Sequence, residues 1–216
     1  MSENLRVKSS QYIDETTRVS FKFNGTTYYG FKGDTLASAL LANNVHLVGR
    51  SFKYHRPRGI MTSGSEEPNA IVQINPNTNR TEPNVRATEV EIYEGMEASS
   101  QNCWPSVNFD IGGINNFLSP FFPAGFYYKT FMWPASFWEK YEYFIRHSAG
   151  LGKSPTLKDP DIYDHRNIHC DVLVVGAGIS GILAAKNAAK NNYKTLLLDE
   201  KNAVSYTHLT LPTIAI

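Results

Sequence analysis

The sequence predicts an α+β domain followed by the start of an α/β domain. Two observations indicate this: a hairpin signal with a helix and further strands behind it, and a glycine-rich strand–turn–helix unit near the end. The chain has 216 residues, 42% hydrophobic and 19% charged, so it can bury a core. Its net charge of +1 provides no global field for binding nucleic acid or an anionic membrane.

The first predicted domain, residues 18–98, begins with two strands. Apolar and polar residues alternate over 18–23, and β-branched and aromatic residues dominate 26–31. Between them lies Asn24-Gly25, the residue pair that tight hairpin turns favour because both positions can take positive φ. We therefore expect an antiparallel hairpin here, preceded by an N-terminal extension over residues 1–17.

A helix and later strands complete this domain. Asp34 or Thr35 can cap a helix that runs to Asn43, since its apolar residues recur at helical spacing. Strands are expected over 70–74 and 85–92. The order hairpin, helix, strands is typical of a β-grasp, ferredoxin-like domain, although several small folds share these elements.

Residues 99–168 form a predicted connector that is dense in aromatic residues. Thirteen of the 27 aromatic residues of the chain lie between Phe117 and Phe144. Ser136 and Glu139 have the spacing of a capping box, which predicts a helix start. An apolar stripe at helical spacing follows: Phe137, Trp138, Tyr141, Phe144 and Ile145. These aromatics indicate either a docking surface for another domain or subunit, or a face that packs against other parts of the same chain.

The third predicted domain, residues 169–203, begins as a dinucleotide-binding βαβ unit. An apolar strand over 172–175 is followed by Gly-x-Gly-x-x-Gly, a helix to about Asn191 and a second strand over 195–198. Asp199 lies 18 residues after the last glycine, where such units place an acid for a ribose diol. The carboxylates at 199 and 200 favour NAD or FAD over NADP, and the motif does not choose between those two.

The last residues have a different character. Residues 204–213 read VSYTHLTLPT, which is the translation of a DNA string resembling the transposase adapter of a common sequencing library. We therefore expect residues 204–216 to be a non-native tail, and the natural protein to continue differently. The alternative is a genuine strand, because LTLPTIAI contains β-forming residues.

Other features point to a soluble, cytoplasmic protein without a metal site. Cys103 and Cys170 have no partner pattern, so a disulfide scaffold is not expected. Neither a signal peptide nor a membrane-spanning run is found in the sequence. Basic residues cluster at Arg50, Lys53, His55, Arg56 and Arg58, and we read this run as a structural loop or domain contact rather than a nucleic-acid site.

Several stretches closely resemble the N-terminal part of the α subunits of heterotetrameric sarcosine oxidases. They are GDTLASALLANNVHLVGRSFKYHRPRGIMTSGSEEPNAIVQI, EPNVRATEVEIYEGMEASSQNCWP, LSPFFPAGFYYKTFMWP and the glycine-rich unit. The resemblance covers about residues 10–203. Similar α subunits serve other amine dehydrogenases and hydrogen cyanide synthases, so the resemblance indicates the family more firmly than the substrate.

The resemblance implies NAD at the glycine-rich unit of the complete subunit. Two sets of residues would line it: Gly176, Gly178, Ser180 and Gly181 at the pyrophosphate turn, and Asp199, Glu200 and Lys201 at the adenosine ribose. It also implies FMN and tetrahydrofolate sites beyond this chain, FAD in the β subunit, and β, γ and δ subunits as partners. The implied reaction oxidises sarcosine to glycine, with hydrogen peroxide and methylenetetrahydrofolate as products, and no residue of this chain is expected to catalyse amine oxidation.

Some relatives hold a 2Fe–2S cluster in the first domain through C-x4-C-x2-C and a further cysteine. Laid on this sequence, the pattern falls on Met61, Gly64, Glu66 and Asn69, where the glycine is kept and the cysteines are not. We therefore expect no iron–sulfur cluster. Two other functions stay open: an α subunit of a related flavin-dependent amine or amino-acid dehydrogenase, and a non-enzymatic β-grasp binding module.

Overall fold

The computed structural model describes residues 5–6, 13–121, 133–148, 150–152 and 154–199. The chain divides into two compact units, Met1–Pro160 and Asp161–Ile216, each of which is described by itself. The expected non-native tail, residues 204–216, lies outside the described residues. In the described part of the chain, no helix is both long and apolar enough to cross a membrane.

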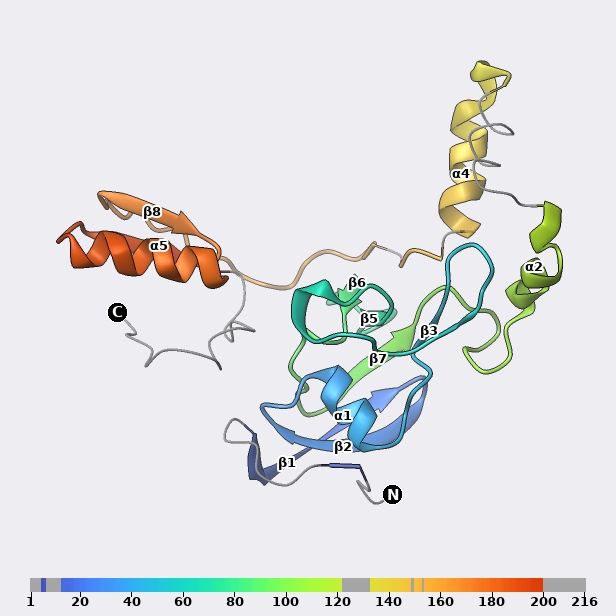
Figure 1. The fold of residues 1–216 in the computed structure, drawn as a ribbon, viewed down its shortest axis with the longest axis horizontal. Helices are drawn as coiled ribbons and strands as arrows, with labels where there is room; N and C mark the ends of the chain where they lie inside the picture. The colour runs from blue at the N-terminus through green and yellow to red at the C-terminus, as the bar shows by residue number, and fades with distance from the viewer. Residues whose placement is uncertain (1–4, 7–12, 122–132, 149, 153, 200–216) are drawn as a thin grey trace. The chain divides into compact units, whose positions relative to one another are not determined.

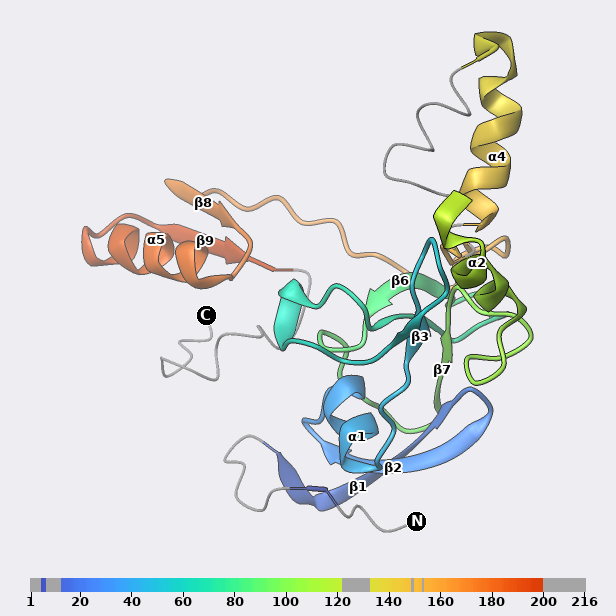
Figure 2. The ribbon, with the colours of Figure 1, turned by 45° about the vertical axis from the view of Figure 1, so that its right-hand side comes forward.

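The first unit is built on a mixed five-stranded sheet (Figure 1). Its strands are β1 (Asp14–Phe23), β2 (Thr26–Lys32), β5 (Ile71–Ile74), β6 (Glu82–Arg86) and β7 (Met96–Ser100), and their spatial order is β2-β1-β7-β5-β6. β1 and β7 pair in parallel, and the other neighbours pair antiparallel. Helix α1 (Leu36–Ala42) lies against one face of this sheet, as both views show (Figures 1 and 2).

The predicted hairpin is present. Asn24 and Gly25 have φ of 50° and 78°, the left-handed values that the tight turn requires. Along β1 the alternation places Val19, Phe21 and Phe23 in the core, where each is at most 8% exposed. The strand begins at Asp14 rather than Arg18, so the expected extension over 1–17 is shorter than predicted; a bulge between Asp14 and Arg18 carries the pairing with β2 further toward the N-terminus.

Helix α1 confirms the predicted capping. Thr35 is the N-cap, and its hydroxyl accepts a hydrogen bond from the backbone N–H of Ser38 at 3.2 Å. Leu36 and Leu40 are fully buried between the helix and the sheet. The helix ends at Ala42, with Asn43 as C-cap and Asn44 in the left-handed region at φ 61°.

The strand expected over 85–92 is wrong in part. Strand β6 ends at Arg86, and the chain then turns under the start of α1. The carbonyls of Ala87 and Val90 accept hydrogen bonds from the N–H groups of Ala37 and Leu36, at 2.8 and 2.9 Å. After Ala87, whose N–H still donates to the carbonyl of Ala70 at 2.8 Å, the segment leaves the ladder, and its carbonyls satisfy N–H groups at the open end of the helix instead.

Strand β7 was not expected, because residues 96–100 read MEASS, with few β-forming side chains. Its place between β1 and β5 is decided by pairing with residues far away in sequence, such as Phe21 with Met96 and Val72 with Ser100.

Short elements complete the first unit. They are β3 (Gly49–Arg50) and β4 (Pro57–Arg58), which pair antiparallel, and η1 (Gly64–Glu66), η2 (Ile111–Gly113), α2 (Ile114–Phe117), η3 (Ser119–Phe121), η4 (Ala135–Phe137) and α4 (Trp138–Ser148).

The capping box predicted at Ser136 is wrong, because Ser136 lies inside the 3-10 turn η4, whose N-cap is Pro134. Of the predicted apolar stripe, Phe137 and Trp138 are 45% and 40% exposed. The side chain of Phe144 and most of the aromatic segment 121–134 lie outside the described residues.

The second unit is a parallel βαβ unit. β8 (Val172–Val175) and β9 (Thr195–Leu198) occupy the predicted residues and pair in parallel, with α5 (Ile179–Lys190) between them in sequence. Apolar side chains such as Leu173 (54%) and Val175 (79%) stay exposed on β8. A parallel sheet is normally covered on both faces, so this unit leaves apolar surface that more structure would bury.

Candidate functional site

The three fingerprint glycines lie in the turn between β8 and α5 and at the start of α5. Gly176 has φ +96°, a conformation that other residues rarely adopt, and its N–H donates to the carbonyl of Leu198 at 2.7 Å. A Cβ on Gly181 would lie 1.9 Å from the carbonyl oxygen of Gly176, so the helix approaches this closely only with glycine there. A Cβ on Gly178 would meet nothing within 4 Å, which leaves open space in front of the turn.

The N-terminus of α5 opens onto that space. Gly178 is the N-cap with φ −66° and ψ 176°, and no side chain caps the helix. The helical hydrogen bonds begin where the N–H of Ile182 donates to the carbonyl of Gly178 at 2.9 Å. The N–H groups before Ile182 have no carbonyl of the helix to donate to. Such N–H groups and the helix dipole together favour an anion, as a pyrophosphate would be. Ser180 lies in this first turn and is exposed.

Asp199 follows β9 and reaches the same turn. Its carboxylate accepts a hydrogen bond from the N–H of Ala177 at 2.6 Å, which joins the end of the second strand to the glycine-rich loop. The structure therefore brings Asp199 together with Gly176 and Gly178. Glu200 and Lys201, the other two predicted ribose contacts, lie outside the described residues.

The loop where relatives hold a cluster lies in the first unit, between β4 and β5. Met61 is 69% exposed, Glu66 is exposed, and Asn69 is half-buried. Gly64 has φ +75° and its carbonyl accepts a hydrogen bond from the Thr88 hydroxyl at 2.6 Å. The loop thus keeps a defined shape, but it offers a thioether, a carboxylate and an amide where cluster ligands are thiolates.

The centre of this loop is the Glu67 carboxylate, a feature that the sequence analysis missed. Glu67 is 1% exposed. One carboxylate oxygen accepts hydrogen bonds from the N–H groups of Met61 and Thr62 at 2.8 and 2.7 Å, and the other accepts from those of Asn69 and Ala70 at 2.8 and 3.1 Å. The Thr62 hydroxyl adds a fifth contact at 3.3 Å.

These contacts determine the charge state of Glu67. Burial raises the pKa of this carboxyl, but the backbone N–H donors of Thr62, Asn69, Met61 and Ala70 lower it by more, so its pKa lies below the ordinary value of 4.5. Glu67 is therefore an anion at neutral pH, enclosed by donors of its own loop. Nothing in a single sequence distinguishes it from the neighbouring Glu66, which is exposed.

Neither cysteine belongs to this loop. Cys103 follows β7, and Cys170 is part of the second unit. Burial and the Asp110 carboxylate raise the pKa of the Cys103 thiol, while Arg50 opposes them. The thiol therefore loses its proton, and so becomes a metal-binding thiolate, less readily than an ordinary cysteine. Among the described residues, no three His, Cys, Asp or Glu side chains come together as metal ligands. At Met61, Glu66 and Asn69 the side chains are therefore not the thiolates that hold a 2Fe–2S cluster.

Comparison with known proteins adds two family models and three curated relatives. Residues 16–103 match the family described as "2Fe-2S iron-sulfur cluster binding domain", and residues 174–208 match the "NAD(P)-binding Rossmann-like domain". These matches confirm a ferredoxin-like first domain and the start of a Rossmann-like dinucleotide-binding domain.

The relatives share one name. Over 90% of its length, the chain is 56% identical to sarcosine oxidase subunit alpha of Rhizobium meliloti, and the match covers 20% of that protein. Over 93% of its length, it is 30% identical to sarcosine oxidase subunit alpha of Corynebacterium sp. strain U-96, and that match covers 17% of the relative. The chain therefore spans about a fifth of the length of these curated relatives.

A solved structure, L-proline dehydrogenase from P. horikoshii, is similar at a TM-score of 0.40 and 16% identity, covering 85% of this chain and 25% of that one. At this TM-score the likeness adds nothing to the fold assignment. The sequence relatives are more informative: over the shared stretch, the chain is a homologue of the alpha subunits of sarcosine oxidases.

Proposed function

We propose that the chain is the N-terminal part of a sarcosine oxidase α subunit and that its second unit contributes the NAD site of that subunit. The observation that carries the proposal is the turn between β8 and α5. Gly176 has φ +96°, and a Cβ on Gly181 would collide with the backbone oxygen of Gly176. The N-terminus of α5, which follows this turn, has no side-chain cap. Each feature suits a pyrophosphate seated against backbone N–H groups.

In this proposal, each part of the turn has a separate task. Gly178 leaves room for the pyrophosphate, and the first turn of α5, including Ser180, faces the phosphate oxygens. Asp199 holds the loop through the N–H of Ala177 and meets the adenosine ribose with Glu200 and Lys201. NAD supplies a nicotinamide ring that accepts hydride, and the residues of this chain bind and orient it. FAD is the second candidate for the same turn.

The whole enzyme would be an oxidoreductase that converts sarcosine to glycine, with hydrogen peroxide and methylenetetrahydrofolate as products. FMN and tetrahydrofolate would bind elsewhere in the complete subunit, FAD in the β subunit, and the γ and δ subunits would complete a cytoplasmic heterotetramer. The 56% identity to a sarcosine oxidase subunit alpha supports this assignment over a related amine dehydrogenase.

We assign the domains in the predicted order, with two changes in the first: β1 starts earlier, and the β-grasp domain extends to Ser100, the end of β7, rather than to residue 98. The connector then runs to residue 168, the dinucleotide-binding start covers 169–203, and the non-native tail covers 204–216. The β-grasp domain would work without a cluster, as a structural and assembly module. The Glu67 carboxylate supports this, because it occupies the loop centre and engages four backbone N–H groups.

The test is NAD binding by calorimetry to the subunit extended to the length of its relatives. Gly181→Ala should weaken NAD binding at least tenfold, because its Cβ would lie 1.9 Å from the Gly176 carbonyl oxygen and force the helix away. Gly113→Ala is the matched control, since Gly113 has helical angles and a Cβ there would meet nothing. Equal affinity in both variants would contradict the proposed site.

A second measurement addresses the reaction. The reconstituted complex should release hydrogen peroxide with sarcosine, and the 216-residue chain alone should bind NAD weakly or not at all because β8 is still open on one face. A complex that oxidises another secondary amine and leaves sarcosine untouched would favour the dehydrogenase alternative. A subunit with neither NAD binding nor oxidase activity would favour the non-enzymatic module.

A further inference from the structure

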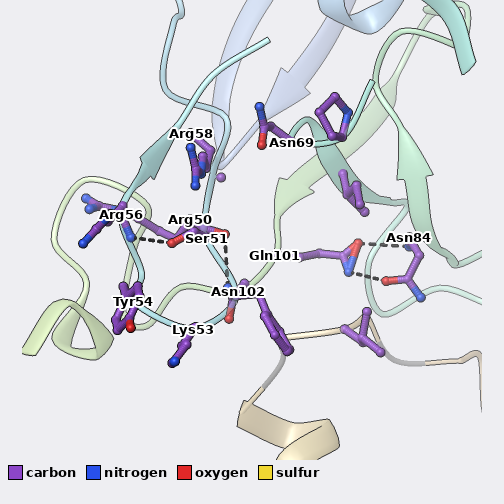
Figure 3. Close-up of a pocket in the computed structure, with 16 residues that line it drawn as sticks. Arg50, Ser51, Lys53, Tyr54, Arg56, Arg58, Asn69, Asn84, Gln101 and Asn102 are labelled. Atoms are coloured by element: carbon purple, nitrogen blue, oxygen red, sulfur yellow. Dashed lines mark hydrogen bonds between the residues drawn. The ribbon is translucent and has the colours of Figure 1, made fainter. Parts of the chain in front are cut away.

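The basic run of the sequence lines a pocket of the first unit that the proposed function does not use. The pocket has a volume of about 420 Å³, within the range of small-molecule sites. Its walls are the β3–β4 hairpin, the sheet edge at β5 and β6, and the residues that follow β7 (Figure 3). The charge of the pocket is one-sided: Arg50, Lys53, Arg56 and Arg58 are among its sixteen lining residues, and none is Asp or Glu.

The cationic side of the pocket is fixed by hydrogen bonds. The Arg50 guanidinium donates to the carbonyls of Val107, His55 and Asn108 at 2.8, 3.2 and 3.2 Å. Carbonyl oxygens hold the guanidinium in place without cancelling its charge. The nearby Asp110 carboxylate is already engaged, because it pairs with His55 at 2.7 Å and accepts N–H groups of its own loop.

Arg58 is the cation best placed to meet a ligand. It lies on β4, opposite Gly49 in the ladder, and its carbonyl accepts a hydrogen bond from Val48 at 2.9 Å, so its backbone is fixed. Its side chain is exposed, and no side-chain partner for it is found among the described residues. In Figure 3, Arg58 and Asn69 lie at one end of the pocket and Lys53 and Tyr54 at the opposite end.

The remaining wall is polar and also preformed. Gln101 and Asn84 exchange two hydrogen bonds, at 2.9 and 2.8 Å, and Asn84 also accepts the N–H of Gly152 at 3.0 Å. Asn102 donates to the Arg50 carbonyl at 3.1 Å, which ties this wall to the hairpin. A pocket whose walls are already hydrogen-bonded to each other loses little entropy when a ligand enters.

We propose that this pocket binds a phosphate group, either free or as the monoester of a small molecule. A phosphate carries a charge of about −1.5 to −2 near pH 7, whereas a carboxylate carries −1. A pocket lined by several cations and no Asp or Glu therefore attracts a phosphate ligand more strongly than a ligand with one carboxylate. The planar guanidinium of Arg58 can donate two parallel hydrogen bonds to phosphate oxygens. A pocket of this size admits a small ester and excludes a folded partner.

The test is calorimetric titration of the 216-residue chain with inorganic phosphate and, separately, with ribose 5-phosphate. Arg58→Ala should weaken binding of either by about tenfold, the loss expected for a charged hydrogen bond. Arg18→Ala is the matched control, because it removes the same charge from an exposed arginine that stacks on Tyr29 in β2, away from the pocket, and should change affinity less than twofold. Tighter binding of ribose 5-phosphate than of inorganic phosphate would identify an ester as the ligand. Equal affinity for the two would identify free phosphate.

NMR of the unmodified chain provides a localisation that does not depend on any variant. The amide shifts caused by inorganic phosphate should fall on residues 49–58 and 101–102. Shifts confined to the N-terminus of α5, the absence of saturable binding, or equal losses in Arg58→Ala and Arg18→Ala would each overturn the proposal. An acidic peptide that shifts residues 49–58 when phosphate does not would overturn it in favour of a protein partner.

Discussion

Glu67→Gln is the substitution that tests most directly what organises the loop over residues 61–70. Each carboxylate oxygen of Glu67 accepts two backbone N–H groups, at distances from 2.7 to 3.1 Å. A glutamine keeps one acceptor oxygen and turns an NH₂ group toward the other pair of donors. Two of these backbone N–H groups, most of which are only partly buried, therefore lose their acceptor whichever way the amide is oriented.

The magnitude follows from those two donors. An unsatisfied buried group costs about 1–3 kcal/mol, and most of these donors are only partly buried, so Glu67→Gln should lower the free energy of unfolding by about 2–3 kcal/mol. That is a large share of the free energy of unfolding of a typical folded protein, which is about 5–15 kcal/mol. Urea unfolding followed by circular dichroism measures the change as a shift in midpoint at constant slope.

Glu66→Gln is the control, because it makes the same chemical change one residue away on an exposed side chain. It should change the unfolding free energy by less than about 0.5 kcal/mol. If the two variants differ by less than that amount, Glu67 does not organise the loop, and the reasoning fails.

The pH dependence provides a second check on Glu67. Its pKa in the folded chain is below 4.5, so its contribution to stability is complete above that value and is lost as the pH falls through the folded-state pKa. The glutamine has no proton to gain. The stabilities of the two chains should therefore converge on acidification, and a constant difference down to the acid limit would contradict the assigned charge state.

Two further predictions concern the first unit. Gly30→Ala should lower the unfolding free energy by about 1–3 kcal/mol, because its Cβ would lie 2.6 Å from the Ile92 side chain and 3.1 Å from that of Ala39. Chemical denaturation measures this change, and an unchanged stability would show that the core rearranges to accept the methyl group. Incubation with iron and sulfide under anaerobic conditions should produce no cluster absorbance, and a chelator should leave the melting temperature unchanged, whereas a visible cluster spectrum would refute the interpretation of Met61, Glu66 and Asn69.

The sequence predicted the parts of the protein that local chemistry decides. Asn24-Gly25 predicted its hairpin because two positive-φ residues leave the chain one favourable turn. Asp34-Thr35 predicted a helix start, of which Thr35 is the cap, and the strands on either side of α5 fell on the predicted residues. Each of these signals depends on residues within one element or one turn.

Only the tertiary structure decided the features that depend on distant neighbours. Strand β7 has a weak strand composition and owes its place to parallel pairing with β1, more than seventy residues earlier. Of two adjacent glutamates, the fold buries Glu67 and exposes Glu66, because the N–H groups of both arms of one loop converge on a single point. The sequence indicated a structural loop or a domain contact for the basic run, and this run becomes a pocket wall because the residues after β7 close the space beside it.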